Sequence, residues 1–208
     1  MKLTGLTLYH FRNYEELHLA LHPGVNLLVG ENAQGKTNLL EAVFYLSTGG
    51  SFRTGRAQEL IGFGAEFADL SCELFSGGRE QSIRAVLFAN RRPRQLYIGG
   101  VKQRSAAELP GVLTTVLFCP EDLYLIREGA AARRSFLDEC ISQLRPRYAL
   151  ALAEYKRLHE HKIRILRDSE EKPSLLDALD EFSMSMAKAG ALLIHYRAHF
   201  IKRLCQTA

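Results

Sequence analysis

The sequence contains no apolar run approaching the ~20 residues that a membrane-spanning helix needs. Its first residues, 1–5, also lack the apolar core of a signal peptide. Cysteine is scarce, and no two cysteines form a CxxC pair or a paired framework. The four are Cys72, Cys119, Cys140 and Cys205. These absences argue against a membrane protein and a disulfide scaffold, and they predict a cytoplasmic protein with reduced thiols.

The composition is that of an ordinary globular protein. Of 208 residues, 47% are hydrophobic and 24% are charged. A chain of this length forms one large domain or two small ones, and it buries about 70% of its unfolded surface. Disorder is therefore not expected.

The net charge of +4 is unevenly distributed along the chain. Residues 91–104 hold five basic residues and no acidic one, and residues 131–167 hold nine basic and four acidic residues. Together these segments carry +10, which leaves −6 for the remainder. Such asymmetry is typical of a surface that binds a polyanion, although solvated helix faces give the same count.

The first half of the chain has strand-like patterns around one helical pattern. Residues 3–9 and the alternating Leu17, Leu19 and Leu21 predict two strands. The apolar run 25–29 predicts a strand covered on both faces. A glycine-rich loop follows, and residues 37–47 have helical periodicity.

Later segments change from strands to helices. Residues 66–101 predict a meander of antiparallel strands, and 112–118 form another strand-like apolar run. Beyond about residue 130, helical spacing predicts helices over 136–144, 150–163 and 179–204, the last two as an antiparallel hairpin. We therefore expect an α/β fold with domains at 1–125 and 126–208.

The glycine-rich loop matches the phosphate-binding pattern GxxxxGK[ST] at every fixed position. Its backbone N–H groups and the start of the following helix provide an anion site. Lys36 is expected to reach the β- and γ-phosphates, and the Thr37 hydroxyl to bind Mg²⁺. The predicted nucleotide-binding residues are Gly30, Glu31, Asn32, Ala33, Gln34, Gly35, Lys36 and Thr37.

Other apparent motifs have plainer interpretations. No apolar strand ends in the acidic residue that a hydrolysing site of this kind uses, because Pro120 interrupts the nearest candidate before Glu121 and Asp122. The FSGGR sequence at 75–79 imitates the LSGGQ signature of ABC-type ATPases, but it lies between two strand-like runs and predicts a hairpin turn. His195 and His199 share a helix face without a third metal ligand, so we interpret them as solvated or structural.

Several joined motifs resemble the RecF family of bacterial DNA replication and repair proteins, relatives of the SMC and Rad50 ATPases. They are residues 11–14 (FRNY), 24–26 (GVN), 30–42, 46–54, 118–123 (FCPEDL), 133–138 (RRSFLD) and 188–190. Within 46–54, Gly50 and Phe52 replace the usual Lys and His. RecF proteins are considerably longer, and their signature and second acidic motifs come after the helical domain, so this chain resembles their N-terminal part.

The resemblance implies a P-loop ABC-type ATPase lobe with a mixed or antiparallel sheet, followed by part of a helical domain. It further implies a protein that binds ATP and Mg²⁺, dimerises with ATP, binds gapped or junction DNA, and works with RecO and RecR in loading recombinase. Arg12 and Asn13 become candidates for adenine contacts, and Glu121 or Asp122 for a position near Mg²⁺. Because the signature is missing, this chain is expected to bind ATP without appreciable turnover.

Two readings of the function remain. The leading one is the ATP-binding N-terminal part of a RecF-like repair ATPase. The alternative is a DNA-binding module whose phosphate loop is not functionally occupied. Both assign DNA contacts to the basic clusters Arg91, Arg92 and Arg94, and Arg133 and Arg134. An unrelated P-loop GTPase is disfavoured because no NKxD motif is present.

Overall fold

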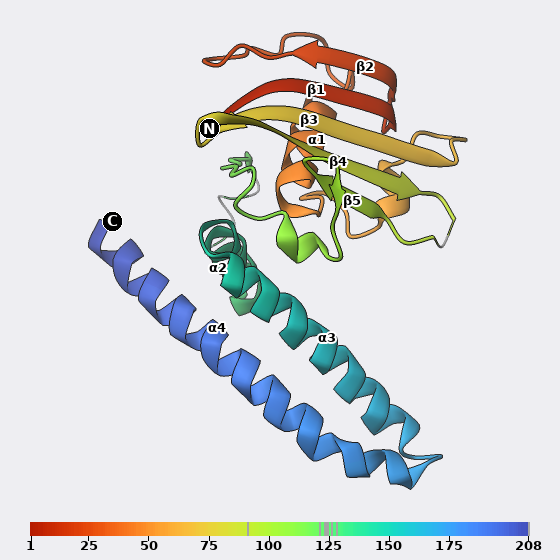
Figure 1. The fold of residues 1–208 in the computed structure, drawn as a ribbon, viewed down its shortest axis with the longest axis vertical. Helices are drawn as coiled ribbons and strands as arrows, with labels where there is room; N and C mark the ends of the chain where they lie inside the picture. The colour runs from red at the N-terminus through yellow and green to blue at the C-terminus, as the bar shows by residue number, and fades with distance from the viewer. Residues whose placement is uncertain (91, 121, 123–124, 126, 128, 208) are drawn as a thin grey trace. The chain divides into compact units, whose positions relative to one another are not determined.

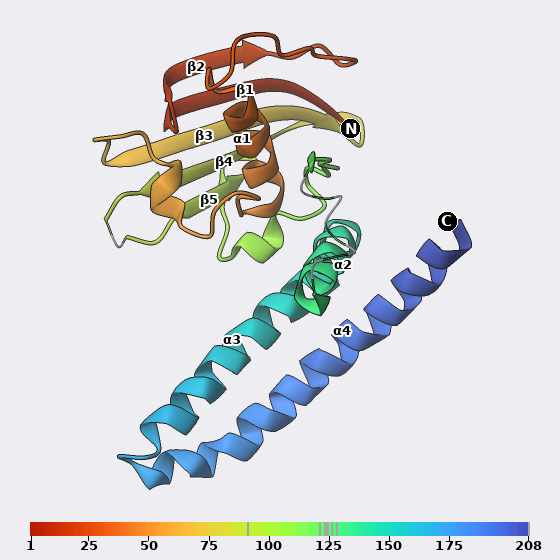
Figure 2. The same ribbon diagram turned by 180° about the vertical axis from the view of Figure 1, so that it is seen from behind.

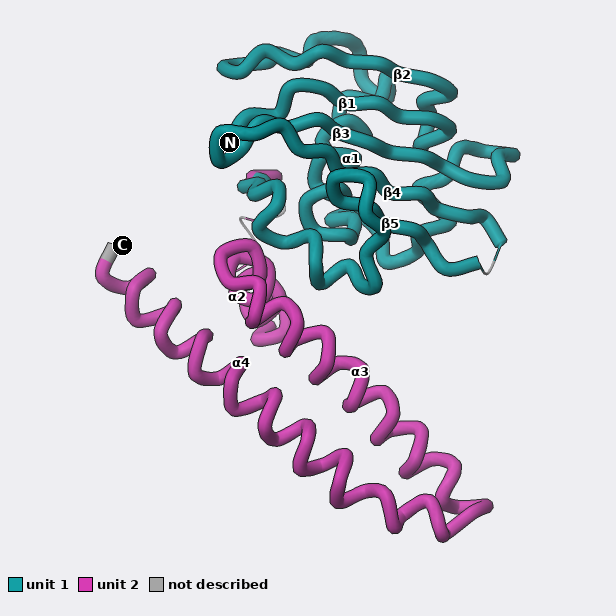
Figure 3. Tube along the Cα trace, in the orientation of Figure 1, with its two compact units in different colours: residues 1–117 teal, residues 118–208 magenta. Residues whose placement is uncertain are grey.

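The computed structural model describes residues 1–90, 92–120, 122, 125, 127 and 129–207. The chain divides into two compact units, residues 1–117 and residues 118–208 (Figure 3). The domain boundary assigned at residues 125 and 126 stays a prediction. In the described part of the chain, no helix is long and apolar enough to cross a bilayer. No disulfide joins the four cysteines, all of which the structure describes.

The first unit is built on a six-stranded antiparallel sheet in the order β2-β1-β3-β4-β5-β6 (Figures 1 and 2). The strands are β1 (Lys2–Phe11), β2 (Tyr14–Ala20), β3 (Phe67–Ser76), β4 (Arg79–Phe88), β5 (Gln95–Ile98) and β6 (Val101–Lys102). The first two strands and the 66–101 meander are thus confirmed. The FSGGR segment forms the β3–β4 turn, where Gly77 and Gly78 both have positive φ, as a two-residue hairpin turn requires.

One face of this sheet is covered by helix α1 (Lys36–Thr48), which is seen in front of the sheet in Figure 2. Alternate residues of β1, β3 and β4 are buried, including Leu8, Leu70 and Ile83, because side chains along a strand point to opposite faces. Tyr45 and Leu46 of α1 belong to the same core. The opposite face carries polar side chains such as Ser71 and Arg84, which are paired across β3 and β4.

Two predicted strands are absent. Residues 25–29 and 112–118 form no strand, although both are short apolar runs. Val25, Leu27 and Val29 are 89%, 82% and 81% exposed, while Leu28 lines an apolar cavity of about 350 Å³ beside α1. The prediction of a strand covered on both faces was therefore wrong for this chain, since nothing in its described part pairs with the segment or covers its outer side.

The second unit consists of helices α2 (Ala130–Leu144), α3 (Pro146–Asp168) and α4 (Leu179–Thr207), with the short 3₁₀ helix η4 (Pro173–Ala178) before α4. Pro146 occupies the first turn of α3, where its missing N–H costs no hydrogen bond. Helices α3 and α4 lie side by side and run antiparallel (Figures 1 and 2), so the helical hairpin is confirmed.

A partly buried polar cluster joins the three helices at one end of the hairpin. The Arg197 guanidinium of α4 donates to both carboxylate oxygens of Asp138 in α2, at 2.8 and 2.9 Å. The Tyr148 hydroxyl of α3 donates to Asp138 and accepts a hydrogen bond of 3.0 Å from Arg197. Because each polar group has a partner, the cluster fixes how the three helices meet.

Candidate functional site: the phosphate loop and its supporting network

The phosphate loop ends in a glycine that no other residue replaces easily. Gly35 has φ +102° and stands immediately before α1. A Cβ atom built there would lie 2.7 Å from Asn13 Oδ1 and 2.8 Å from the Tyr14 hydroxyl. Both the positive φ and the close approach therefore require glycine, and the β1–β2 turn packs directly against the loop.

The Lys36 side chain turns back into the loop. Its Nζ donates to the carbonyl oxygens of Gly30 and Glu31, at 2.6 and 2.5 Å. The predicted phosphate-binding cation therefore lies within the curve of residues 30–36. Thr37 follows in the first turn of α1 and is exposed.

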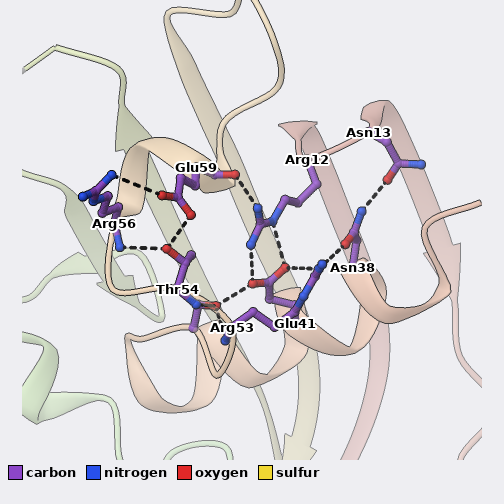
Figure 4. Close-up of polar contacts among 9 residues, drawn as sticks. Arg12, Asn13, Asn38, Glu41, Arg53, Thr54, Arg56 and Glu59 are labelled. Carbon is purple, nitrogen blue, oxygen red and sulfur yellow. Dashed lines mark hydrogen bonds and ion pairs between the residues drawn. The ribbon is translucent and has the colours of Figure 1, made fainter. Parts of the chain in front are cut away.

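The turn between β1 and β2 is tied to the loop by two asparagines. Asn13 Nδ2 donates to the Gln34 carbonyl at 3.2 Å, and Asn38 Nδ2 of α1 donates to Asn13 Oδ1 at 2.7 Å (Figure 4 shows the second bond). The predicted contact residue Asn13 thus lies beside the phosphate loop. It also lines a cavity of about 570 Å³ with Tyr14 and Phe63.

A buried carboxylate in α1 forms ion pairs with two arginines (Figure 4). The side chain of Glu41 in α1 is fully buried and accepts two hydrogen bonds from Arg12, at 2.9 and 2.7 Å. Arg53 Nη1 lies 3.2 Å from the same carboxylate, and the Ser51 hydroxyl donates to it at 2.5 Å. Burial raises the pKa of Glu41, but the hydrogen bonds from Arg12 and Ser51 and the charges of both arginines outweigh it and hold the pKa below its usual value.

This network continues in both directions. Arg53 Nη1 also donates to Asn38 Oδ1 at 2.7 Å, which connects Glu41 to the asparagines at the loop. Arg12 Nη1 donates to the Glu59 carbonyl at 2.7 Å, and the Glu59 carboxylate accepts a bond from Thr54 and pairs with Arg56 at 3.9 Å (Figure 4). Polar contacts therefore run without a break from the phosphate loop to residues 51–59.

The two candidates for adenine contacts differ in their surroundings. All three nitrogens of the Arg12 guanidinium donate to Glu41 or Glu59, so in this structure Arg12 acts on its neighbours within the fold. Asn13 is exposed beside the loop. An adenine contact by either residue stays a prediction.

The predicted DNA-binding arginines lie in both units. In the first unit, the Arg92 guanidinium lies over the Phe88 ring at 5.1 Å, and Arg94 donates to the Tyr45 hydroxyl and the Gly49 carbonyl at the end of α1. In the second unit, Arg133 and Arg134 are exposed on α2. Arg91 lies outside the described residues.

Other candidates from the sequence are placed as follows. Glu121 lies outside the described residues, and Asp122 accepts a 2.8 Å hydrogen bond from the Cys119 backbone. His195 and His199 line a cavity of α3 and α4. In the part of the chain that the structure describes, no group of three His, Cys, Asp or Glu residues is arranged to hold a metal.

Sequence reasoning missed the supporting residues Glu41, Arg53 and Asn38. Glu41 shares its side of the helix with Thr37, Asn38 and Thr48, so the helical pattern gave no signal that its carboxylate is buried. Its partners stand 10 to 29 residues away along the chain, so no local pattern identifies them.

The family profile described as "RecF/RecN/SMC N terminal domain" matches residues 2–100. Over 98% of its length, the chain is 37% identical to the DNA replication and repair protein RecF of Alkaliphilus oremlandii (strain OhILAs). It is 38% identical to the RecF of Clostridioides difficile (strain 630), also over 98% of its length. The chain matches the N-terminal part of the RecF family. It spans 55% and 54% of these two relatives, or about half of their length.

Solved structures agree with this family match. A structure of the recombination mediator protein RecF of the RecFOR pathway with ATP superposes with a TM-score of 0.89 at 34% identity, over 98% of this chain and 54% of that one. The Smc head domain of Pyrococcus furiosus superposes with a TM-score of 0.51 at 20% identity, over 97% of this chain and 58% of that one. The predicted α/β fold, a P-loop ATPase lobe with an antiparallel sheet followed by helices, is confirmed.

Proposed function

We propose that this chain is the ATP-binding N-terminal part of a RecF-like ATPase of DNA replication, recombination and repair. The observation that carries the proposal is the geometry of the phosphate loop. Lys36, the first residue of α1, donates hydrogen bonds from its ammonium group to the Gly30 and Glu31 carbonyls of the loop. The similarity to RecF-ATP over nearly the whole chain supports ATP as the nucleotide.

The residues around the loop suit this ligand. The loop N–H groups and Lys36 would hold the triphosphate, and Thr37 would supply a hydroxyl ligand to Mg²⁺. The cavity beside Asn13 would accommodate the adenine, with Phe63 as an exposed aromatic side chain at its wall. The buried Glu41 would neutralise one of the two arginines that hold the β1–β2 turn and residues 51–59 around the loop.

We extend the proposal to the setting of the whole protein. The RecF match supports a cytoplasmic protein that acts with DNA in the RecFOR pathway. Gapped or junction DNA, RecO, RecR and an ATP-dependent second copy are the proposed partners.

An ATP titration tests the nucleotide part of this proposal. We expect calorimetry with Mg²⁺ to detect binding to this chain, and phosphate release in the same samples to stay at the rate of a protein-free blank. The reason is that no strand in the described part of the chain supplies a catalytic carboxylate next to the loop. Absence of binding at millimolar ATP would favour the alternative, a DNA-binding module with an unoccupied loop. Steady turnover would show that the chain completes a hydrolytic site by itself.

We further propose that residues 25–29 become a strand when the rest of a RecF-like protein is present. The segment is an apolar run apart from Asn26. Its residues Val25, Leu27 and Val29 are exposed, and its backbone makes no hydrogen bond to another segment within the described residues. A strand from the part of the relatives that this chain does not span would satisfy both the backbone and the apolar side chains.

Hydrogen exchange tests this assignment directly. In the 208-residue chain, amides of 25–29 are expected to exchange rapidly, whereas those of β4, which is paired on both sides, exchange slowly. In a full-length RecF-like protein the same five amides should become protected. Strong protection of 25–29 in the 208-residue chain would contradict the proposal.

A further inference from the structure

Two adjoining cavities of the second unit form a groove whose charged lining is entirely basic. One, of about 480 Å³, is lined by residues that include Arg145, Arg147, His195 and His199. The other, of about 390 Å³, shares Arg145 and His199 and adds Arg203. We call the five residues Arg145, Arg147, His195, His199 and Arg203 the cationic groove. No Asp or Glu is among the residues described as lining either cavity.

The groove differs from other basic surface of the same unit. On α3, Arg157 pairs with Glu154 at 2.7 Å, and Arg167 pairs with Asp168 at 2.8 Å. Within the described residues neither Arg145 nor Arg147 pairs with a carboxylate, and the hydrogen bond from Arg145 goes to the Leu144 carbonyl. The guanidinium groups of Arg145 and Arg147 therefore attract anions more strongly than arginines that are paired with a carboxylate do.

The spacing of the hydrogen-bond donors in the groove suits a polymer of phosphates. His195, His199 and Arg203 recur every four residues along α4, so they form a row about 12 Å long at 1.5 Å per residue. Neighbouring phosphates of one B-DNA strand lie farther apart in space than the axial rise of about 3.4 Å, because the strand winds around the axis, so a row of this length would reach two or three phosphates. Arg145 and Arg147, at the junction of α2 and α3, line the same groove.

The groove is also held in shape. Arg197 lies between the two histidines in sequence, and its bonds to Asp138 and Tyr148 attach this stretch of α4 to α2 and α3. Tyr196, which lines both cavities, packs edge-on against Tyr148 at 5.8 Å. A groove built on fixed helices presents its cations at constant spacing, which favours binding of a regular polyanion.

We propose that the cationic groove binds the phosphate backbone of DNA. The proposal rests on the proposed function, and it assigns the DNA contact to residues other than the basic clusters at 91–94 and 133–134. It also gives a role to His195 and His199, whose shared helix face neither a metal nor a catalytic site explains. An acidic protein is the competing partner, but the even spacing of the row fits repeating phosphates better than irregularly placed carboxylates.

The test compares two triple variants with the same change of charge. The groove variant is Arg145→Gln/Arg147→Gln/Arg203→Gln. Its matched control is Arg157→Gln/Arg164→Gln/Arg167→Gln, which removes three cations of α3 that do not line the groove. Binding to a fluorescein-labelled gapped duplex is followed by anisotropy between about 50 and 200 mM salt.

We expect the groove variant to lose at least about tenfold in DNA affinity, because three phosphate contacts disappear. The slope of log K against log salt should fall by about 2 to 3, at about 0.9 for each lost contact. The control should stay within about threefold of wild type, and Arg145→Lys/Arg147→Lys/Arg203→Lys should keep the wild-type slope, since counterion release depends on charge.

The other outcomes contradict either the proposed function or the groove inference. If the wild type does not bind DNA, DNA binding as part of the proposed function fails, and this inference fails with it. If the wild type binds and the folded groove variant binds with unchanged affinity and slope, the inference alone is wrong. The inference is also wrong if the groove variant keeps its affinity for DNA but no longer binds an acidic protein that the wild type binds. Should the triple variant fail to fold, Arg147→Gln alone must lower the slope by about 0.9 for the proposal to stand.

Discussion

Replacing Lys36 by alanine is expected to lower the affinity for ATP by at least about 100-fold. The ammonium lies within the loop and would make charge-assisted hydrogen bonds to the triphosphate, each contributing roughly 1.5–3 kcal/mol. Its contacts in the structure are with the Gly30 and Glu31 carbonyls of the exposed loop, so the fold does not depend on it. Calorimetric titration of the wild type and of the variant measures the difference.

Lys102→Ala provides the control for the loss of one positive charge from the first unit. Lys102 is exposed on β6, and its removal should leave ATP affinity within about twofold because an exposed charge is well screened. Equal ATP affinity of Lys36→Ala and wild type would mean that nucleotide binds elsewhere, and the proposed function would lose its main support.

Replacing Glu41 by alanine is expected to destabilise the first unit by about 3 kcal/mol. The carboxylate is fully buried between Arg12 and Arg53, so its removal leaves the partly buried Arg12 and the more exposed Arg53 without their counter-charge. Urea denaturation, followed by a probe of the sheet, measures the change. Glu16→Ala is the control: its side chain is 59% exposed beside His18, and its loss should cost less than about 0.5 kcal/mol.

The pH dependence of stability provides a second readout for Glu41. Its folded pKa lies below the ordinary value of 4.5, so the carboxylate stabilises the fold fully above pH 4.5 and loses this effect as the pH falls through the folded pKa. Glu41→Gln removes the titrating group while keeping its shape. Its unfolding free energy should therefore fall less steeply with acid than that of the wild type, and identical slopes would contradict the assignment.

Local patterns predicted the parts of the fold that depend on local interactions. The β3–β4 hairpin, helix α1 and the two long helices each follow from a periodicity or a turn within one stretch of sequence. The strand predicted for residues 25–29 is absent, because a strand also needs a neighbouring strand to pair with. The pattern contains the apolar run with Val25, Leu27 and Val29, but it does not contain the strand that would pair with them.

The candidate site was predicted to a similar extent. The loop and Lys36 follow from a short motif whose chemistry is contained in eight residues. The polar network around Glu41 does not follow from a short motif. Glu41 binds Arg12, which is 29 positions away in the sequence, and these hydrogen bonds depend on how α1 packs on the sheet. Arg94 illustrates the same limit: it was predicted from its charge alone to bind DNA, and its contact with Tyr45 spans 49 positions.

The strand order has a consequence for how the protein folds. Of the five strand pairings in the described part of the chain, four join strands that are consecutive in sequence, and β1 with β3 is the exception. Such short-range pairings close small loops and form quickly. All six strands and the buried core, which extends to Leu113, precede α2 in the sequence, so the N-terminal unit is able to fold without waiting for the helices α2 to α4 to be complete.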